Sequence, residues 1–84
     1  MQIRPYPVID PVATGNNIRR LRMERGMSVR ELQAYFGFEQ PQAIYKWQQG
    51  LTLPSVDNLV ALSVILDVPI DAILVVDAVS SQAI

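Results

Sequence analysis

The 84-residue sequence contains no cysteine and no histidine, and these two absences narrow the chemistry open to it. Without cysteine the chain has neither disulfides nor thiolate metal ligands. Without histidine it lacks the most common general base and metal ligand. The eight carboxylates are scattered singly, and none forms a close pair that would separate two pKa values. We therefore expect no catalytic site, no metal, no cofactor and no small-molecule ligand.

Long apolar runs are missing as well, although half of the residues are hydrophobic. No run approaches the ~20 residues that are needed to cross a bilayer. The first residues lack the basic-then-apolar pattern of a secretion signal, so we expect a cytoplasmic protein. A chain of this length forms one small domain with a modest core, which a second chain often helps to stabilise.

Charges of the two signs occupy different halves of the chain, although the net charge is only −1. Residues 16–54 hold six basic and three acidic side chains, a balance of 6 − 3 = +3, whereas residues 55–84 hold four acidic and no basic ones. A polyanion would therefore meet the first half. Charge alone leaves an ordinary solvated surface as an equal alternative.

Helix-start and helix-stop residues divide the chain into an arm, five short helices and a tail. Three prolines predict an extended arm over residues 1–13. An all-α domain over residues 14–76 and a frayed tail over residues 77–84 follow. The expected helices begin at or near Thr14, Ser28 (a capping box with Glu31), Pro41, Ser55 and Ile70, and stop near Arg25, Phe36, Gly50, Asp67 and Leu74.

The third expected helix, Pro41 to Gln49, has two contrasting faces. At 100° per residue, Ile44 and Trp47 share one face, which we expect to lie in the core. The opposite face is polar and contains no acidic residue. Glutamine can hydrogen-bond to adenine through two atoms, and lysine can donate to guanine or to phosphate. From the residues alone, this face is either a DNA-reading surface or a solvated one.

An ordered series of residues runs through the chain from Ile18 to Leu74. The series consists of Ile18, Leu21, Arg22, Gly26, Met27, Ser28, Leu32, Phe36, Gly37, Phe38, Ile44, Trp47, Gly50, Pro54, Leu59, Leu62, Leu66 and Val68. It resembles the XRE, Cro and lambda-repressor family of helix-turn-helix domains. The resemblance implies a five-helix fold and sequence-specific binding of double-stranded DNA, usually as a dimer. It implies a transcriptional regulator, repressor-like, with Pro41–Gln49 as recognition helix.

The resemblance, together with the residue chemistry, gives two sets of candidate DNA contacts. The candidates for base readout are Gln40, Gln42, Ala43, Tyr45, Lys46 and Gln49. The candidates for phosphate contact are Val29 and Arg30, at a helix N-terminus that attracts phosphate, and Thr52, after the recognition helix.

Four positions depart from the family pattern and bear on the angle of the recognition helix. The turn before it has one extra residue near Glu39, and Val29 replaces a common phosphate-binding glutamine. Gln33 occupies a position that is commonly small. Gln48 replaces a glutamate that commonly pairs with Arg22, so we expect a charged–neutral hydrogen bond instead of an ion pair.

Apolar residues beyond the expected core face of the fourth helix predict a homodimer. The candidate interface residues are Val60, Ala61, Val64, Ile65, Ile70 and Val75. The alternative is that the proline-rich arm folds back over this surface within one chain. For function, the alternative to DNA binding is a protein–protein interaction adaptor with the same fold.

Overall fold

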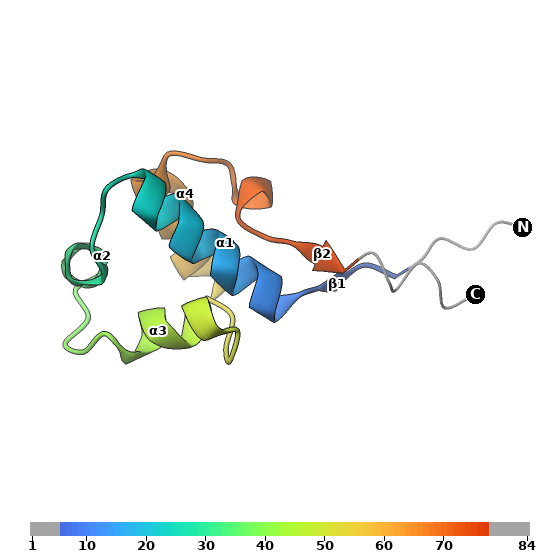
Figure 1. The fold of residues 1–84 in the computed structure, drawn as a ribbon, viewed down its shortest axis with the longest axis horizontal. Helices are drawn as coiled ribbons and strands as arrows, with labels where there is room; N and C mark the ends of the chain where they lie inside the picture. Colours follow the sequence, from blue (N-terminus) through green and yellow to red (C-terminus); the bar gives the residue numbers. More distant parts are fainter. Residues whose placement is uncertain (1–5, 78–84) are drawn as a thin grey trace, which may run out of the picture.

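Helices form most of the structure, a computed structural model that describes residues 6–77 (Figure 1). The elements are β1 (Val8–Ile9), α1 (Pro11–Glu24), α2 (Val29–Phe36), α3 (Gln42–Gln49), α4 (Val56–Leu66), the 3-10 turn η1 (Ile70–Ala72) and β2 (Val76–Asp77). Within residues 6–77 there are thus four α-helices, and the expected fifth helix over 70–74 is present only as the single 3-10 turn η1, after which the Leu74 N–H still donates to the Ile70 carbonyl at 3.2 Å. None of the helices in these residues is both long and apolar enough to span a membrane.

The first helix begins earlier than expected, which shortens the predicted arm of residues 1–13. Asp10 is the N-cap and accepts a hydrogen bond from the Ala13 N–H at 3.0 Å. Pro11 occupies the first helical position, where a missing N–H has no cost. The prediction of Thr14 as the cap is wrong, because its side chain is buried and its hydroxyl accepts from the Val75 N–H at 2.9 Å.

A short antiparallel strand pair joins the two ends of the described chain, which the all-α prediction did not include. Val8 pairs with Asp77 and Ile9 pairs with Val76. Asp77 therefore belongs to a strand and not to a frayed tail. The rest of the expected tail, 78–84, and the start of the arm, 1–5, lie outside the described residues.

Local signals place α2, α3 and α4 as predicted. Ser28 and Glu31 form the reciprocal capping box at the start of α2. The left-handed residues Gly37 and Gly50 end α2 and α3, with φ of 71° and 76°. The Ser55 side chain caps α4 by accepting from the Asn58 N–H at 3.2 Å.

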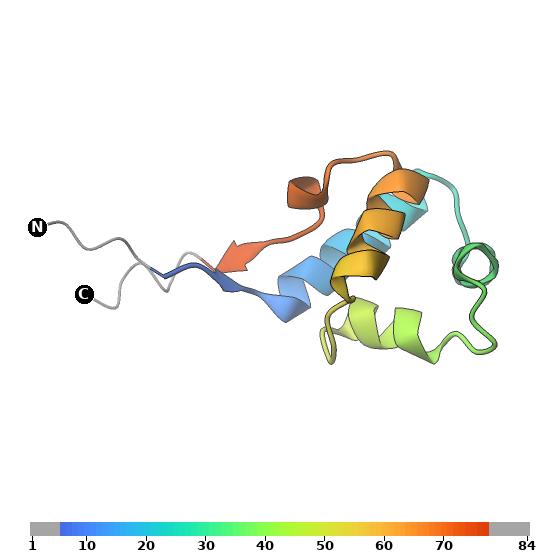
Figure 2. The same ribbon diagram turned by 180° about the vertical axis from the view of Figure 1, so that it is seen from behind.

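The core lies where the four α-helices meet, and α3 runs below α1 and α4 (Figure 2). Trp47 is only 4% exposed, which confirms its predicted place in the core. α1 approaches α3 closely at Gly15, where an added Cβ would lie 2.1 Å from the Trp47 carbonyl oxygen. Glycine at this position allows the two backbones to touch. The largest fully buried apolar side chains are Ile18, Leu32, Ile44, Leu62, Leu66 and Ile73.

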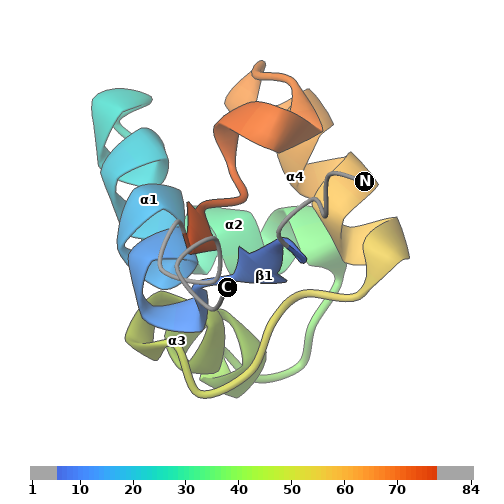
Figure 3. The same ribbon diagram turned by 90° about the vertical axis from the view of Figure 1, so that its right-hand side faces the viewer.

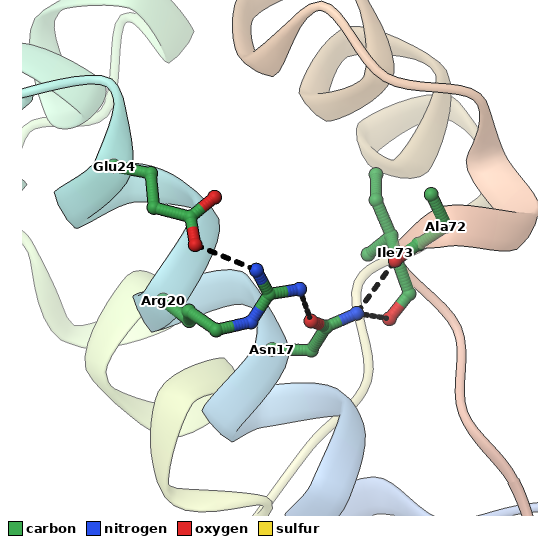
Figure 4. A network of polar contacts seen from close by, with 5 residues as sticks. All are labelled: Asn17, Arg20, Glu24, Ala72 and Ile73. Carbon is green, nitrogen blue, oxygen red and sulfur yellow. Dashed lines mark hydrogen bonds and ion pairs between the residues drawn. The ribbon is translucent and has the colours of Figure 1, made fainter.

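Polar side chains of α1 hold the segment after η1 against the domain (Figure 4). The Asn17 side-chain amide donates to the Ala72 carbonyl at 2.6 Å and to the Ile73 carbonyl at 3.0 Å. The Asp10 N–H donates to the Val75 carbonyl at 2.8 Å. Asn17 thus caps the carbonyls at the end of η1 and ties this segment to α1.

Candidate nucleic-acid interface

One face of α3 is polar, exposed and free of carboxylates. Gln42, Tyr45, Lys46 and Gln49 are all exposed, whereas Ile44 and Trp47 on the opposite side are buried. The helix is thus anchored by one face and presents the other to solvent, as its 3.6-residue period predicts. Gln40 is also exposed, but it lies in the link before α3. Ala43 is half-buried and packs against the core, so it contributes less to this surface.

A groove between α2 and α3 brings candidate base-reading and phosphate-binding residues together. The cavity has a volume of about 600 Å³. Arg30, exposed near the start of α2, and Tyr45, on α3, lie on its two sides. The lining residues are Val29, Arg30, Gln33, Ala34, Phe38, Pro41 and Tyr45.

The other two phosphate candidates differ from Arg30 in what they offer. Val29 also lines the groove, but its side chain is aliphatic, half-buried and packed against the core, so only its backbone N–H could serve as a donor. Thr52 is exposed, but it lies in the loop after α3 and not in the groove.

The N-terminus of α2 is ordered by its capping box. The Ser28 N–H donates to Glu31 Oε1 at 2.9 Å, and the Glu31 N–H donates to Ser28 Oγ at 3.0 Å. The Ser28 backbone N–H, and after it the Ser28 hydroxyl, lower the pKa of the Glu31 carboxyl from its ordinary value of 4.5. The capping box therefore favours the ionised form of Glu31, a residue that is not part of the lining of the groove.

Arg22 connects α3 to α1 and to the turn after α1. Its Nε donates to Gln48 Oε1 at 2.9 Å, which confirms the expected charged–neutral hydrogen bond. Its Nη1 donates to the Met27 carbonyl at 2.7 Å. The Arg22 guanidinium therefore joins α1 to α3 and to the turn after α1, and it is not presented to a ligand.

The turn before α3 is closed by contacts that the sequence did not indicate. The Gln33 side chain donates to the Phe38 carbonyl at 3.1 Å, and the Phe38 N–H donates to the Gln33 carbonyl at 3.1 Å. The Phe38 ring stacks on Phe36 with centroids 5.1 Å apart, and both rings meet Trp47 edge-on. The aromatic residues on either side of Gly37 were the available signal. These contacts fix the position of the longer link relative to the buried side of α3.

The basic side chains divide into those that are engaged within the fold and those that are not. Arg20 contacts Asn17 and pairs with Glu24 at 2.8 Å (Figure 4). Arg25 donates to the Leu66 carbonyl at 2.9 Å. Within residues 6–77, neither Arg30 nor Lys46 forms an ion pair with a carboxylate, so both can attract an anion.

The six candidate dimer residues are not equivalent. Val60 and Val64 are exposed on α4, with 66% of Val64 accessible. Ile65 packs against the core, and Ala61 is half-buried. Val75 is half-buried, and both of its backbone groups bond to the Asp10 and Thr14 region.

Ile70, the sixth candidate, opens onto an apolar hollow beside α4. The proline-rich arm reaches this hollow through Ile9 but leaves Val60 and Val64 exposed. The hollow is lined by Ile9, Ser63, Ile70, Asp71, Leu74 and Val76.

Comparisons with known proteins agree with this arrangement. The helix-turn-helix family model matches residues 18–73, which is more than half of the chain and contains α2, α3 and α4 completely. No curated protein and no solved structure matches the chain.

Proposed function

The chain belongs to the XRE type of the helix-turn-helix family, and on this premise we propose that it reads a specific duplex DNA sequence as a repressor-like transcription regulator. The family is one of DNA-binding domains, which favours this function over the protein-interaction adaptor. The observation that carries the proposal is the exposed, acid-free face of α3, whose opposite face is fixed in the core by Ile44 and Trp47.

We assign α3 to the major groove, which admits a helix of this diameter. Gln42 and Gln49 offer bidentate amides for adenine, and Lys46 donates to guanine or to phosphate. Tyr45 lies at the edge of the α2–α3 groove, where its hydroxyl can reach a phosphate. Gln40 extends this surface on the link before α3.

We assign backbone contacts to the two segments that flank α3. Arg30, at the start of α2, forms no ion pair with a carboxylate of residues 6–77, and a helix N-terminus also attracts phosphate. Thr52 offers a hydroxyl just beyond the end of α3. Such contacts position the protein on the duplex, and the base edges then supply specificity.

We further propose that the regulator binds as a homodimer. Val60 and Val64 form an exposed apolar stripe on α4, and Val56, which is also exposed, extends it by one turn. Apolar surface of this kind marks interfaces in small domains. Two-fold symmetry would place two copies of α3 about 34 Å apart, one turn of DNA.

The test is selection of binding sites from random duplexes, followed by fluorescence-anisotropy titration of the selected site at two salt concentrations. We expect a two-fold symmetric site and an affinity that falls steeply with salt, because phosphate binding releases counterions. Lys46→Ala should weaken binding, whereas Arg19→Ala, an exposed cation on α1, is the matched control. If the folded protein does not bind any duplex at low salt, DNA reading is excluded and the adaptor function takes its place.

A further inference from the structure

The link between α2 and α3 is held at one residue, Phe38, by two hydrogen bonds with Gln33. The Phe38 N–H donates to the Gln33 carbonyl at 3.1 Å, a bond that commonly accompanies a left-handed glycine at a helix end. The Gln33 side-chain amide donates to the Phe38 carbonyl, also at 3.1 Å. The first bond belongs to the backbone of the turn, whereas the second depends on the identity of the side chain at position 33.

The rest of the link is held less firmly. Glu39 and Gln40 are exposed, and within residues 6–77 neither forms a hydrogen bond with another residue. α3 then follows Pro41, which makes no side-chain bond to the start of the helix. Phe38 is therefore the last firmly bonded point on the chain before the helix that carries the proposed reading face.

The ring of Phe38 connects this point to the buried side of α3. It stacks on Phe36 and meets Trp47 edge-on, with the Phe38 and Trp47 centroids 6.0 Å apart. The helix α2 appears end-on in Figure 1 and side-on in Figure 3, whereas α3 runs lengthwise in Figure 1, so the two helices cross. Helices that cross lie close over a short stretch only. The placement of α3 relative to α2 therefore depends on the link and on this aromatic contact.

The same two helices carry groups that we assign to DNA, on opposite sides of the groove between them. Arg30 lies three residues before Gln33 on α2, so both residues are on one face of that helix, and both line the groove. Tyr45 lines the groove from α3. Gln33 thus lies between the proposed phosphate contact and the link that leads to the proposed base contacts. A shift of Phe38 would change the separation of Arg30 from α3.

We propose that Gln33 is a positioning residue for DNA reading. Its bond to the Phe38 carbonyl sets where α3 begins relative to α2, so that Arg30 meets a phosphate while Gln42 and Lys46 meet base edges. The inference rests on the proposed DNA reading and adds a residue that acts through protein contacts. Specific binding needs phosphate and base contacts together, whereas non-specific binding needs the phosphate contacts alone. Gln33 therefore governs discrimination between duplexes more than affinity for DNA as such.

The first test measures discrimination, the ratio of the dissociation constants for a random duplex and for a duplex with one selected half-site. A single half-site binds one copy, so dimerisation does not enter the comparison. Gln33→Met keeps the length of the side chain and removes its donor. We expect it to lower the ratio by roughly tenfold, the contribution of one good base contact, with little change on the random duplex. Gln33→Glu is a second variant without a donor, and its added charge weakens binding to both duplexes alike.

The matched control is Asn17→Leu. Asn17 is also half-buried and also donates a side-chain amide to backbone carbonyls, those of Ala72 and Ile73. Leucine removes these bonds at a place that is not part of the groove. We expect Asn17→Leu to lose stability in urea and to keep its discrimination, and circular dichroism verifies that each variant is folded. Equal losses of discrimination in Gln33→Met and Asn17→Leu overturn the inference.

The second test uses the free protein. Trp47 is the only tryptophan of the chain, so its fluorescence reports on the neighbouring rings of Phe36 and Phe38. Because Gln33 holds Phe38 in place, Gln33→Met should shift the Trp47 emission, whereas Gln42→Ala on the exposed face of α3 should leave it unchanged. An unchanged emission in Gln33→Met overturns the inference even where discrimination falls, since Gln33 would then act by direct contact with the duplex.

The third test is a double-mutant cycle between Gln33→Met and Arg30→Ala on the selected half-site. Once Arg30 is removed, its place relative to α3 no longer matters, so the two losses of affinity should not add. Additive losses overturn the inference. Unchanged discrimination in both Gln33 variants also overturns it and leaves the proposed DNA reading intact. If the wild type binds no duplex at low salt, DNA reading itself fails, and this inference fails with it.

Discussion

The Nε of Arg22 donates to Oε1 of Gln48 at 2.9 Å, and this single bond joins α1 to the C-terminal half of α3. Both side chains are half-buried, so solvent weakens the bond less than it would on an open surface. Because Gln48 is neutral, the bond has a charge on one side only. This arrangement leads to the first prediction.

Gln48→Glu should raise the free energy of unfolding by about 0.5–1 kcal/mol at neutral pH, since a carboxylate gives Arg22 a charged partner. Urea denaturation measures the change. Gln49→Glu is the control, because it adds the same charge to the last turn of α3 on an exposed residue. An equal effect in both variants would show that Arg22 is not the cause.

Gly15→Ala should be far more damaging than Gly26→Ala. A Cβ at Gly15 would lie 2.1 Å from the Trp47 carbonyl, so α1 and α3 must separate, with an expected loss of about 3 kcal/mol or more. A Cβ at Gly26 would meet no atom within 4 Å other than those of Gly26 and its chain neighbours, and the loss is limited to about 1–2 kcal/mol for the left-handed conformation. Thermal unfolding of the two variants would contradict this reasoning if their midpoints were equal.

Gln33→Ala should lower the free energy of unfolding by about 1 kcal/mol, because the Phe38 carbonyl loses its side-chain donor. Gln42→Ala is the matched control in chemical denaturation, since Gln42 is exposed on α3.

DNA binding should depend on Gln42, which we assign to base readout. Gln42→Ala should weaken binding to the selected DNA site by roughly 1–3 kcal/mol if its amide is bidentate to a base. Loss of stability in Gln42→Ala would undermine its assignment to the reading face.

Stability should decline in acid partly through Glu31. The Ser28 backbone N–H, and then its hydroxyl, lower the pKa of Glu31 in the folded state, so ionised Glu31 favours folding. This contribution is complete above the ordinary value of 4.5 and is lost as pH falls through the lower folded pKa. Denaturation curves from pH 7 to pH 3 should show a shallower decline for Glu31→Gln. Parallel curves for the two proteins would mean that the capping box is not pH-sensitive.

Much of the candidate site could be predicted because its determinants are local. The Ser28 and Glu31 capping box, and the glycines that end α2 and α3, depend on a few neighbouring residues. The inward and outward faces of α3 follow from helical spacing alone, which is why Trp47 was placed correctly. The contact between Arg22 and Gln48 was accessible only through the family resemblance, since 26 residues separate them.

The same distinction explains the errors at the two ends of the domain. Thr14 has a capping side chain, and Asp10 is equally capable of capping. Asp10 caps the helix and Pro11 follows it in the first helical position, whereas the Thr14 hydroxyl accepts from the Val75 N–H, 61 residues away. The expected fifth helix forms as the 3-10 turn η1, and the carbonyls of Ala72 and Ile73 at its end accept from Asn17, 55 and 56 residues away in the chain.

The sequence by itself determined the helices that carry the site and the direction in which α3 presents its polar face, because caps and periodicity act within a few residues. The tertiary structure alone decided that Gly15 sits against the Trp47 carbonyl and that Val8–Ile9 pairs with Val76–Asp77. These contacts join segments that are distant in the chain, and no local preference specifies which distant segment will supply the partner.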